Sequence, residues 1–182
     1  MKAALIVVDM VNEFVHGRLA TPEALKTVEP SRMVIEAFRN AGLPVVYTND
    51  SHYPDDPEMN IWGQHSMKGD SGSEVIDEIR PESGDYIVEK HTYSGFYGTN
   101  LDIILRSHGI DTVVIIGLDA DICVRHTAAD ALYRNYHIMI VEDAVAARID
   151  RNWKDYFVKV YGARIVRSDE IAKILSEDQI ET

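Results

Sequence analysis

The chain has 182 residues, of which 46% are hydrophobic, so it is long enough to bury one sizeable core. Its formal net charge of −12 gives no overall attraction to nucleic-acid phosphates or to anionic membrane surfaces. A single cysteine excludes an intramolecular disulfide and fits a reducing compartment such as the cytoplasm, and no stretch resembles a signal peptide or a membrane span.

Short apolar segments occur at intervals along the whole chain. They are rich in β-branched residues and almost continuously apolar, which is typical of strands in a parallel sheet that is covered on both faces. In chain order, the predicted strands are residues 3–8, 44–49, 85–90, 112–118, 137–143 and 163–168.

Helical patterns lie between most of these strands, at residues 22–42, 99–109, 121–135 and 151–162. Three glycines follow these patterns, where helices often need a left-handed residue: Gly42, Gly109 and Gly162. The alternation predicts an α/β fold, a doubly wound, Rossmann-like parallel sheet of about six strands with helices on both faces. We expect residues 1–182 to form one domain, and the polar residues 176–182 to fray.

Residues 50–84 interrupt this alternation. The segment is too long and too polar for a simple connection, and long structured insertions in compact domains are more often functional than not. Its aromatic residues Tyr53 and Trp62 would either line a pocket or pack the segment onto the domain.

Chemically active side chains follow four of the predicted strands. They are Asp9 after the first strand, Asp50 and His52 after the second, Lys90 after the third, and Cys123 after the fourth. Ligands of open α/β sheets bind beyond the carboxyl ends of the strands, so these groups are expected on one edge of the sheet.

Cys123, Asp9 and Lys90 would together form a nucleophile, a base and an orienting cation. Cys123 would lie in the first turn of a helix, where free N–H groups lower the pKa of a thiol. Taken alone, each residue also has a structural explanation. Cys123 would fill the core, Asp9 would cap a turn, and Lys90 would be a solvated strand-end lysine.

Asp50 and His52 are two residues apart, so their side chains leave an extended chain on the same side. His65 returns from the far part of the insertion. One carboxylate and two imidazoles with open positions suit zinc or a similar divalent ion, although surface histidines give the same pattern. We expect the remaining carboxylates of the insertion to be solvated loop charges: Asp55, Asp56 and Glu58.

Three blocks of the sequence resemble the signature blocks of isochorismatase-like cysteine hydrolases. They are "ALIVVDMVNEF" at 4–14, "KHTYSGFYGTNLDIIL" at 90–105 and "GLDADICVRHTAADAL" at 117–132. The resemblance extends over residues 4–145 in the expected order. This superfamily includes nicotinamidases, N-carbamoylsarcosine amidases and isochorismatases.

The resemblance implies a catalytic triad of Cys123, Asp9 and Lys90, in which the thiolate attacks a carboxamide carbon and ammonia leaves before water hydrolyses the thioester. It also implies a cis peptide bond between Leu118 and Asp119. The backbone amides of Asp119 and Cys123 would then form the oxyanion hole. By their positions, Phe14 and Tyr97 would join Trp62 in the walls of the substrate pocket.

The segment "NDSHYPDDPEMNIWGQH" resembles the metal-binding segment of nicotinamidases, which implies Asp50, His52 and His65 as ligands of a divalent metal, usually zinc. There the metal anchors the substrate. Ser51, however, replaces a usual tryptophan, and Asp119 is larger than usual at an oxyanion position. The resemblance therefore implies a small-molecule amide substrate and leaves nicotinamide and an N-carbamoyl amino acid both open.

Two other functions and one structural question stay open at this stage. An isochorismatase-type hydrolase would use the same fold, although that branch generally lacks the metal ligands. A receiver-like signalling domain would also place Asp9, Asp50 and Lys90 at strand ends. Apolar residues on the outer helices would serve either a homo-oligomer interface or the core.

Overall fold

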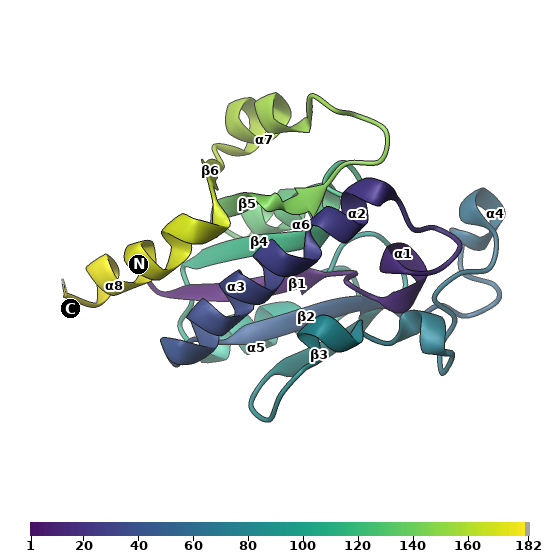
Figure 1. Ribbon diagram of the computed structural model, residues 1–182, viewed down its shortest axis with the longest axis horizontal. Helices are drawn as coiled ribbons and strands as arrows, with labels where there is room; N and C mark the ends of the chain where they lie inside the picture. Colours follow the sequence, from purple (N-terminus) through teal and green to yellow (C-terminus); the bar gives the residue numbers. More distant parts are fainter. Residues whose placement is uncertain (181–182) are drawn as a thin grey trace.

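A six-stranded parallel sheet runs through the centre of the computed structural model (Figure 1). The strand order is β3-β2-β1-β4-β5-β6, so the order reverses between β1 and β4. The structure describes residues 1–180, and side chains as far as residue 177. The strands are β1 (Ala3–Val8), β2 (Val45–Asp50), β3 (Tyr86–Lys90), β4 (Thr112–Leu118), β5 (His137–Ala146) and β6 (Arg164–Val166).

Helices cover both faces of this sheet. The helices are α1 (Asn12–Val15), α2 (Pro22–Lys26), α3 (Val28–Asn40), α4 (Met59–Trp62), α5 (Leu101–Ser107), α6 (Cys123–Tyr133), α7 (Trp153–Tyr161) and α8 (Ile171–Ile180), with short 3₁₀ turns η1 (Ser71–Ser73), η2 (Asp77–Ile79) and η3 (Ser168–Glu170).

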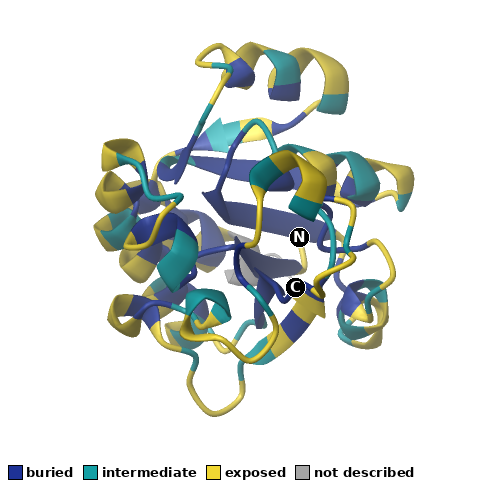
Figure 2. Cartoon of the chain, turned by 90° about the vertical axis from the view of Figure 1, so that its right-hand side faces the viewer, coloured by how far each residue is buried: buried dark blue, intermediate teal, exposed yellow. Residues whose placement is uncertain are grey.

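Two apolar clusters lie on opposite faces of the sheet. On one face, α2, α3 and α8 pack on alternate strand residues, with Phe38 and Ile171 among the buried side chains. On the other face, α5, α6 and α7 contribute buried residues such as Leu105 and Phe157. Figure 2 shows the central strands as buried, with exposed stretches on the edge strands, while the helices expose one side. Because helices cover both faces of the sheet, the loops that could form a site lie at the ends of the strands.

All predicted strands are confirmed, to within three residues at each end. The predicted helix at 22–42 is wrong in one respect, because it is divided into α2 and α3 at Thr27, whose hydroxyl donates to the carbonyl oxygen of Ala24 at 2.7 Å. The prediction of a frayed tail from Ser176 is also wrong as far as Ile180, because α8 continues to that residue.

The close approach of β1 and β4 requires a glycine at position 117. Gly117 has a φ of +110°, and a Cβ atom there would lie 2.0 Å from the carbonyl oxygen of Val8. The register between β4 and β5 also shifts between Ile115 and Gly117. The chain can therefore turn sharply after β4, which directs residues 119–123 over the end of β1.

The insertion at 50–84 is ordered by contacts with the domain. Isolated bridges join Val11 to Val75 and His52 to Met67, and the guanidinium of Arg18 donates to the carbonyl oxygens of Trp62 and Gln64. The part of the insertion that includes α4 lies with α1 beyond the carboxyl ends of β1 and β2 (Figure 1). Among the described residues, no helix combines the length and the apolarity needed to cross a lipid bilayer.

Candidate active site

Four neighbouring strands bring Asp9, Asp50, Lys90 and Cys123 together. Asp50 and Lys90 are directly paired in the register of β2 and β3, and the amide of Asp9 donates to Thr48 of β2 at 3.0 Å. One ligand atom from each of Asp9, Asp50 and Cys123 lies within 4.8 Å of the others. These four side chains, which the sequence predicted at the strand ends, thus gather beside the point where the strand order reverses, between β1 and β4.

The Lys90 ammonium lies between two carboxylates, those of Asp9 and Asp50. Its Nζ is 2.8 Å from Oδ2 of Asp9, and it donates to Oδ1 of Asp50 and to the carbonyl oxygen of Thr92, the latter at 3.2 Å. All three charged side chains are completely buried or nearly so. The opposite charges facing Lys90 outweigh the effect of burial and hold its pKa well above the usual range. Lys90 therefore stays positively charged.

Asp9 is poised between its protonated and ionised forms at neutral pH. Burial and the neighbouring Asp50 carboxylate raise its pKa to about 7, against the opposing effect of Lys90. The pKa of Asp50 moves the other way: burial works to raise it, but Lys90 and His52 hold it at about 2. The two carboxylates are therefore distinct in character, one a proton acceptor and donor near neutrality and the other a permanent anion.

Cys123 lies at the start of α6 and is buried, with its Sγ within 4.8 Å of a carboxylate oxygen of Asp9. Burial, together with Asp9 and Asp50, raises the pKa of the thiol well above its usual range, although Lys90 opposes this. The expectation that the pKa of Cys123 is lowered at the start of the helix is therefore wrong, because burial and the two carboxylates have the larger effect. Cys123 rests as a thiol, and Asp9 is the group placed to receive its proton.

Two backbone amides, those of Asp119 and Cys123, lie at the two ends of the loop that leads from β4 into α6. The peptide bond between Leu118 and Asp119 is cis. The next amide, that of Ala120, donates to the carbonyl oxygen of Ala146 at 2.7 Å. Within the part of the chain that the structure describes, the amides of Asp119 and Cys123 donate to no protein acceptor. Two donors are thus available for an oxygen atom bound beside the thiol.

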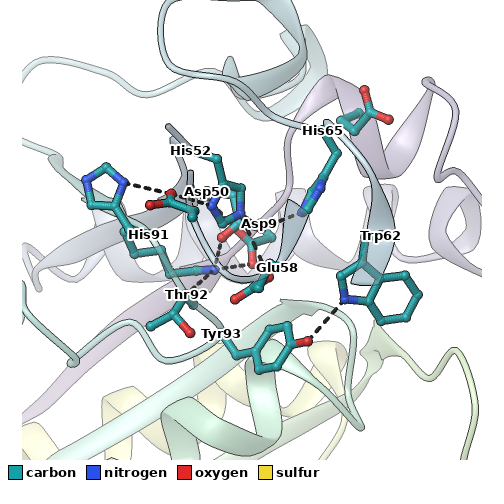
Figure 3. A network of polar contacts seen from close by, with 12 residues as sticks. Asp9, Asp50, His52, Glu58, Trp62, His65, His91, Thr92 and Tyr93 are labelled. Carbon is teal, nitrogen blue, oxygen red and sulfur yellow. Dashed lines mark hydrogen bonds and ion pairs between the residues drawn. The ribbon is translucent and has the colours of Figure 1, made fainter. Parts of the chain in front are cut away.

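A small cavity of about 20 Å³ lies against Cys123, room for about one water molecule. Its wall includes Phe14 and Trp62, as the sequence analysis expected. Tyr97 was wrongly predicted there, because its side chain is 72% exposed at the turn of its loop. Tyr93, four residues earlier, occupies the wall instead, and its hydroxyl accepts a hydrogen bond of 3.1 Å from Nε1 of Trp62 (Figure 3).

Arg148 was missed by the sequence analysis, since it lies in a loop after β5 without any motif. It is the one lysine or arginine among the described residues lining this cavity. Its Nε donates to Oδ2 of Asp119 at 2.5 Å and its Nη2 donates to the carbonyl oxygen of Leu19 at 2.7 Å. The carboxylate of Asp121 accepts from the amide of Arg148 and fixes the loop. A guanidinium has five N–H donors, so these contacts leave capacity for an anion.

A second polar group lies next to the triad, formed by Asp50, His52, His65 and Glu58 (Figure 3). One ligand atom from each lies within 4.8 Å of the others. Nε2 of His52 and Nε2 of His65 are 3.4 and 3.9 Å from Oδ2 of Asp50. The expectation that Glu58 is a solvated loop charge is wrong, since Glu58 is only 4% exposed and its Oε2 is 3.8 Å from Nε2 of His52.

Unpartnered atoms show that this second group fits a cation. Among the described residues, buried atoms without a hydrogen-bond partner include Oδ2 of Asp50, Nε2 of His52 and Oε1 of Glu58. Leaving such atoms unpaired is costly, and all three can coordinate a metal. Burial and Asp50 raise the pKa of Glu58 to about 7, so its negative charge is disfavoured unless a positive charge is near. Two imidazoles with carboxylates match zinc.

Residues 3–170 match the family described as "Isochorismatase domain". The chain belongs to the isochorismatase family. A receiver-like signalling domain is therefore excluded. The resemblance seen in the three sequence blocks is confirmed, as is the fold that it implied.

Solved structures of this family place the chain among its amidases. It is 81% identical to N-carbamoylsarcosine amidase from Thermoplasma acidophilum, with a TM-score of 0.93 over 94% of this chain and 99% of that one. Nicotinamidase PncA from Bacillus subtilis is 32% identical, with a TM-score of 0.85, over 92% and 100%. Pyrazinamidase of Pyrococcus horikoshii in complex with zinc is 30% identical, with a TM-score of 0.82, over 92% and 99%. The chain is an amidohydrolase that cleaves C–N bonds in linear amides.

Proposed function

We propose that this amidohydrolase cleaves the terminal carbamoyl group of a small N-carbamoyl amino acid, with Cys123 as nucleophile, Asp9 as general base and acid, and Lys90 as the orienting cation. The observation that carries the substrate class is Arg148, a guanidinium in the wall of the cavity that holds Cys123. The 81% identity to a structure named N-carbamoylsarcosine amidase supports the same choice.

In the first half of the reaction, the thiol of Cys123 passes its proton to Asp9 while Sγ bonds to the carbamoyl carbon. The carbonyl oxygen, which gains negative charge, accepts hydrogen bonds from the amides of Asp119 and Cys123. Asp9 then returns the proton to the departing nitrogen, and the C–N bond breaks to release ammonia. A carboxyl group with a pKa of about 7 suits both roles near neutral pH.

In the second half, water attacks the carbonyl carbon of the S-carbamoyl enzyme. Asp9 accepts a proton from the water and gives it to Sγ as the C–S bond breaks, so the thiol is restored. The product is a carbamic acid, which decomposes to the amine and carbon dioxide. Lys90 remains protonated throughout and keeps Asp9 aimed at Cys123.

Arg148 distinguishes the two substrate classes, because an N-carbamoyl amino acid has a carboxylate and nicotinamide has none. Hydrogen bonds to charged groups contribute about 1.5–3 kcal/mol, which corresponds to roughly 10–150-fold in binding. Replacing Arg148 with methionine is therefore expected to raise KM for N-carbamoylsarcosine by that factor. Ammonia release, followed in a coupled assay, measures the hydrolysis of both N-carbamoylsarcosine and nicotinamide.

The methyl ester of N-carbamoylsarcosine controls for disturbance of Asp119, which loses its ion pair in the Arg148→Met variant. Damage to the loop would slow both compounds equally, whereas loss of the anion contact affects only the free acid. A wild-type enzyme that prefers nicotinamide, or a variant that loses the acid and the ester in equal measure, would contradict the proposed substrate.

We further propose that Asp50, His52 and His65, joined by Glu58, hold a divalent metal, with zinc as the leading candidate. The donor set, the buried atoms without partners and the zinc-bound pyrazinamidase relative support this. Such an ion would supply a fixed positive charge that anchors a polar atom of the substrate. This group is also the observation that favours nicotinamide as the second candidate substrate.

Removing the metal is expected to raise KM more than it lowers kcat, because the ion would position the substrate and the nucleophile is the thiol. The comparison uses enzyme treated with a chelator and enzyme reloaded with zinc, each tested on N-carbamoylsarcosine and nicotinamide. A fall in kcat with unchanged KM would assign the ion a chemical role instead.

The same proposal treats residues 1–182 as one domain that acts in the cytoplasm. The lone, buried thiol of Cys123 fits a reducing compartment, because the reaction requires it in its reduced form. Size-exclusion chromatography with light scattering would determine whether the chain forms a homo-oligomer.

A further inference from the structure

His52 lies between two carboxylates that contact opposite sides of its ring. Nε2 faces Oδ2 of Asp50 at 3.4 Å, within the proposed metal site. Nδ1, on the other side, is 2.9 Å from Oδ2 of Asp56. The His52 side chain is completely buried, so these contacts are not shared with solvent. The orientation of the ring therefore depends on Asp56.

Asp56 is held in place independently of His52. The amide of Tyr53 donates to the same Oδ2 at 2.9 Å, and the amide of Asp56 donates to the carbonyl oxygen of Tyr53, which closes a tight turn. Nδ1 of His91 is 3.4 Å from this oxygen, and the His91 ring stacks on Tyr53 with centroids 4.8 Å apart. This turn places the carboxylate of Asp56 against the imidazole of His52, four residues earlier in the chain.

The hydrogen bond at one ring nitrogen of histidine decides which nitrogen carries the lone pair. An ionised carboxylate only accepts hydrogen bonds, so Nδ1 of His52 donates to Asp56, and the lone pair that His52 can offer a cation is that of Nε2. His65 shows the same arrangement with a different acceptor, since its Nδ1 donates to the carbonyl oxygen of Gly63 at 2.8 Å. Both Nε2 lone pairs consequently face the group formed with Asp50 and Glu58.

We infer that Asp56 is a positioning residue of the metal site: it fixes the tautomer and ring angle of His52 so that Nε2 is presented to the cation. The inference rests on the metal site proposed above. It assigns a role to a carboxylate that the sequence alone indicated to be a solvated loop charge. Because Asp56 carries a negative charge, it also makes His52 a stronger ligand than a neutral acceptor would.

The test is a measurement of zinc affinity on the full chain, freed of metal and titrated against a chromogenic chelator. Asp56→Ala is expected to bind zinc 10–100-fold more weakly than the wild type. Asp56→Asn keeps an oxygen acceptor for Nδ1 and for the Tyr53 amide but loses the charge, so its loss should be smaller. The matched control is Asp55→Asn, which removes an exposed charge from the adjacent position and should bind zinc like the wild type.

Thermal unfolding of the metal-free proteins separates positioning from folding. If Asp56→Ala binds zinc as tightly as the wild type, Asp56 is only a turn residue and the inference is overturned. The inference is also overturned if the Tm of metal-free Asp56→Asn falls in proportion to its zinc affinity, because a less stable fold then explains the weaker zinc binding. If the wild type itself binds no zinc while remaining folded, the metal site is refuted and the role of Asp56 with it.

Discussion

Replacing Lys90 with methionine tests the electrostatic arrangement at the centre of the site. Methionine has a similar length and fills the buried space, but it carries no charge. The change removes the ammonium that lies between Asp9 and Asp50, both of which are fully buried at the ends of their strands. Two carboxylates less than 5 Å apart would then face each other without it.

The expected loss of stability is large. Removing one partner of a buried ion pair costs about 3–5 kcal/mol, because the other charge stays buried without compensation. Asp9 limits the loss, since with a pKa of about 7 it takes up a proton readily. For a chain of this size, 1 kcal/mol corresponds to about 2–4 °C in Tm, so we expect Tm to fall by about 6–20 °C near pH 8.

The loss should shrink as the pH falls. In the wild type, Lys90 helps to hold the pKa of Asp50 at about 2, below its ordinary value of 3.8, so the ionised form stabilises the fold above pH 4. Without Lys90, this pKa rises above the ordinary value. The fold then loses stability as the pH rises through the new pKa, and regains it when acid protonates the carboxyl.

Thermal unfolding followed by circular dichroism, at pH 5 and pH 8 with a chelator present, measures both effects. The control is Lys68→Met, which removes an exposed lysine that pairs with Glu89 on the surface, and its Tm should stay within about 2 °C of the wild type. A Lys90→Met variant that melts like the wild type at pH 8, or with an equal deficit at both pH values, would refute the reasoning.

Three further outcomes are expected. Cys123→Ser should lower kcat by on the order of 10³ or more while Tm changes little, and amide hydrolysis close to the wild-type rate would exclude a thiol nucleophile. In the wild type, kcat/KM should fall about tenfold per pH unit below pH 7, because only ionised Asp9 accepts the proton; a rate that is flat from pH 5 to 8 would argue against this base. Gly117→Ala should destabilise the fold by about 2–6 kcal/mol, seen as a lower Tm or insoluble protein, since its Cβ would overlap Val8; normal melting would disprove the close approach.

The central strands were predictable because each is a short, continuous apolar run, and such runs need no knowledge of their neighbours. β1 and β4 are clear examples, with every residue buried. The prediction that Asp9, Lys90 and Cys123 lie close together followed from these strand assignments, because parallel strands have their carboxyl ends at one edge of the sheet. Helix α8 was missed even though Ile171, Ile174 and Leu175 have helical spacing.

The contacts of the insertion could not be predicted, because burial there depends on how an irregular segment packs. Glu58 and Asp55 both stand among prolines and acids, yet one is buried beside His52 and the other is exposed. Tyr93 and Tyr97 lie four residues apart in a loop, where no regular period decides which one faces inward. The pKa of Cys123 likewise follows from burial and nearby carboxylates, which a helix position alone does not reveal.

The hydrogen bond between Trp62 and Tyr93 has a kinetic consequence. These side chains come from separate segments and together line the cavity against Cys123, whose thiol is buried in this structure. Arg18 anchors the backbone on either side of Gly63, which favours rotation of the two rings over displacement of the whole segment. Where substrate entry requires that rotation, its frequency sets an upper limit on turnover, and burial of the thiol also protects it from oxidants.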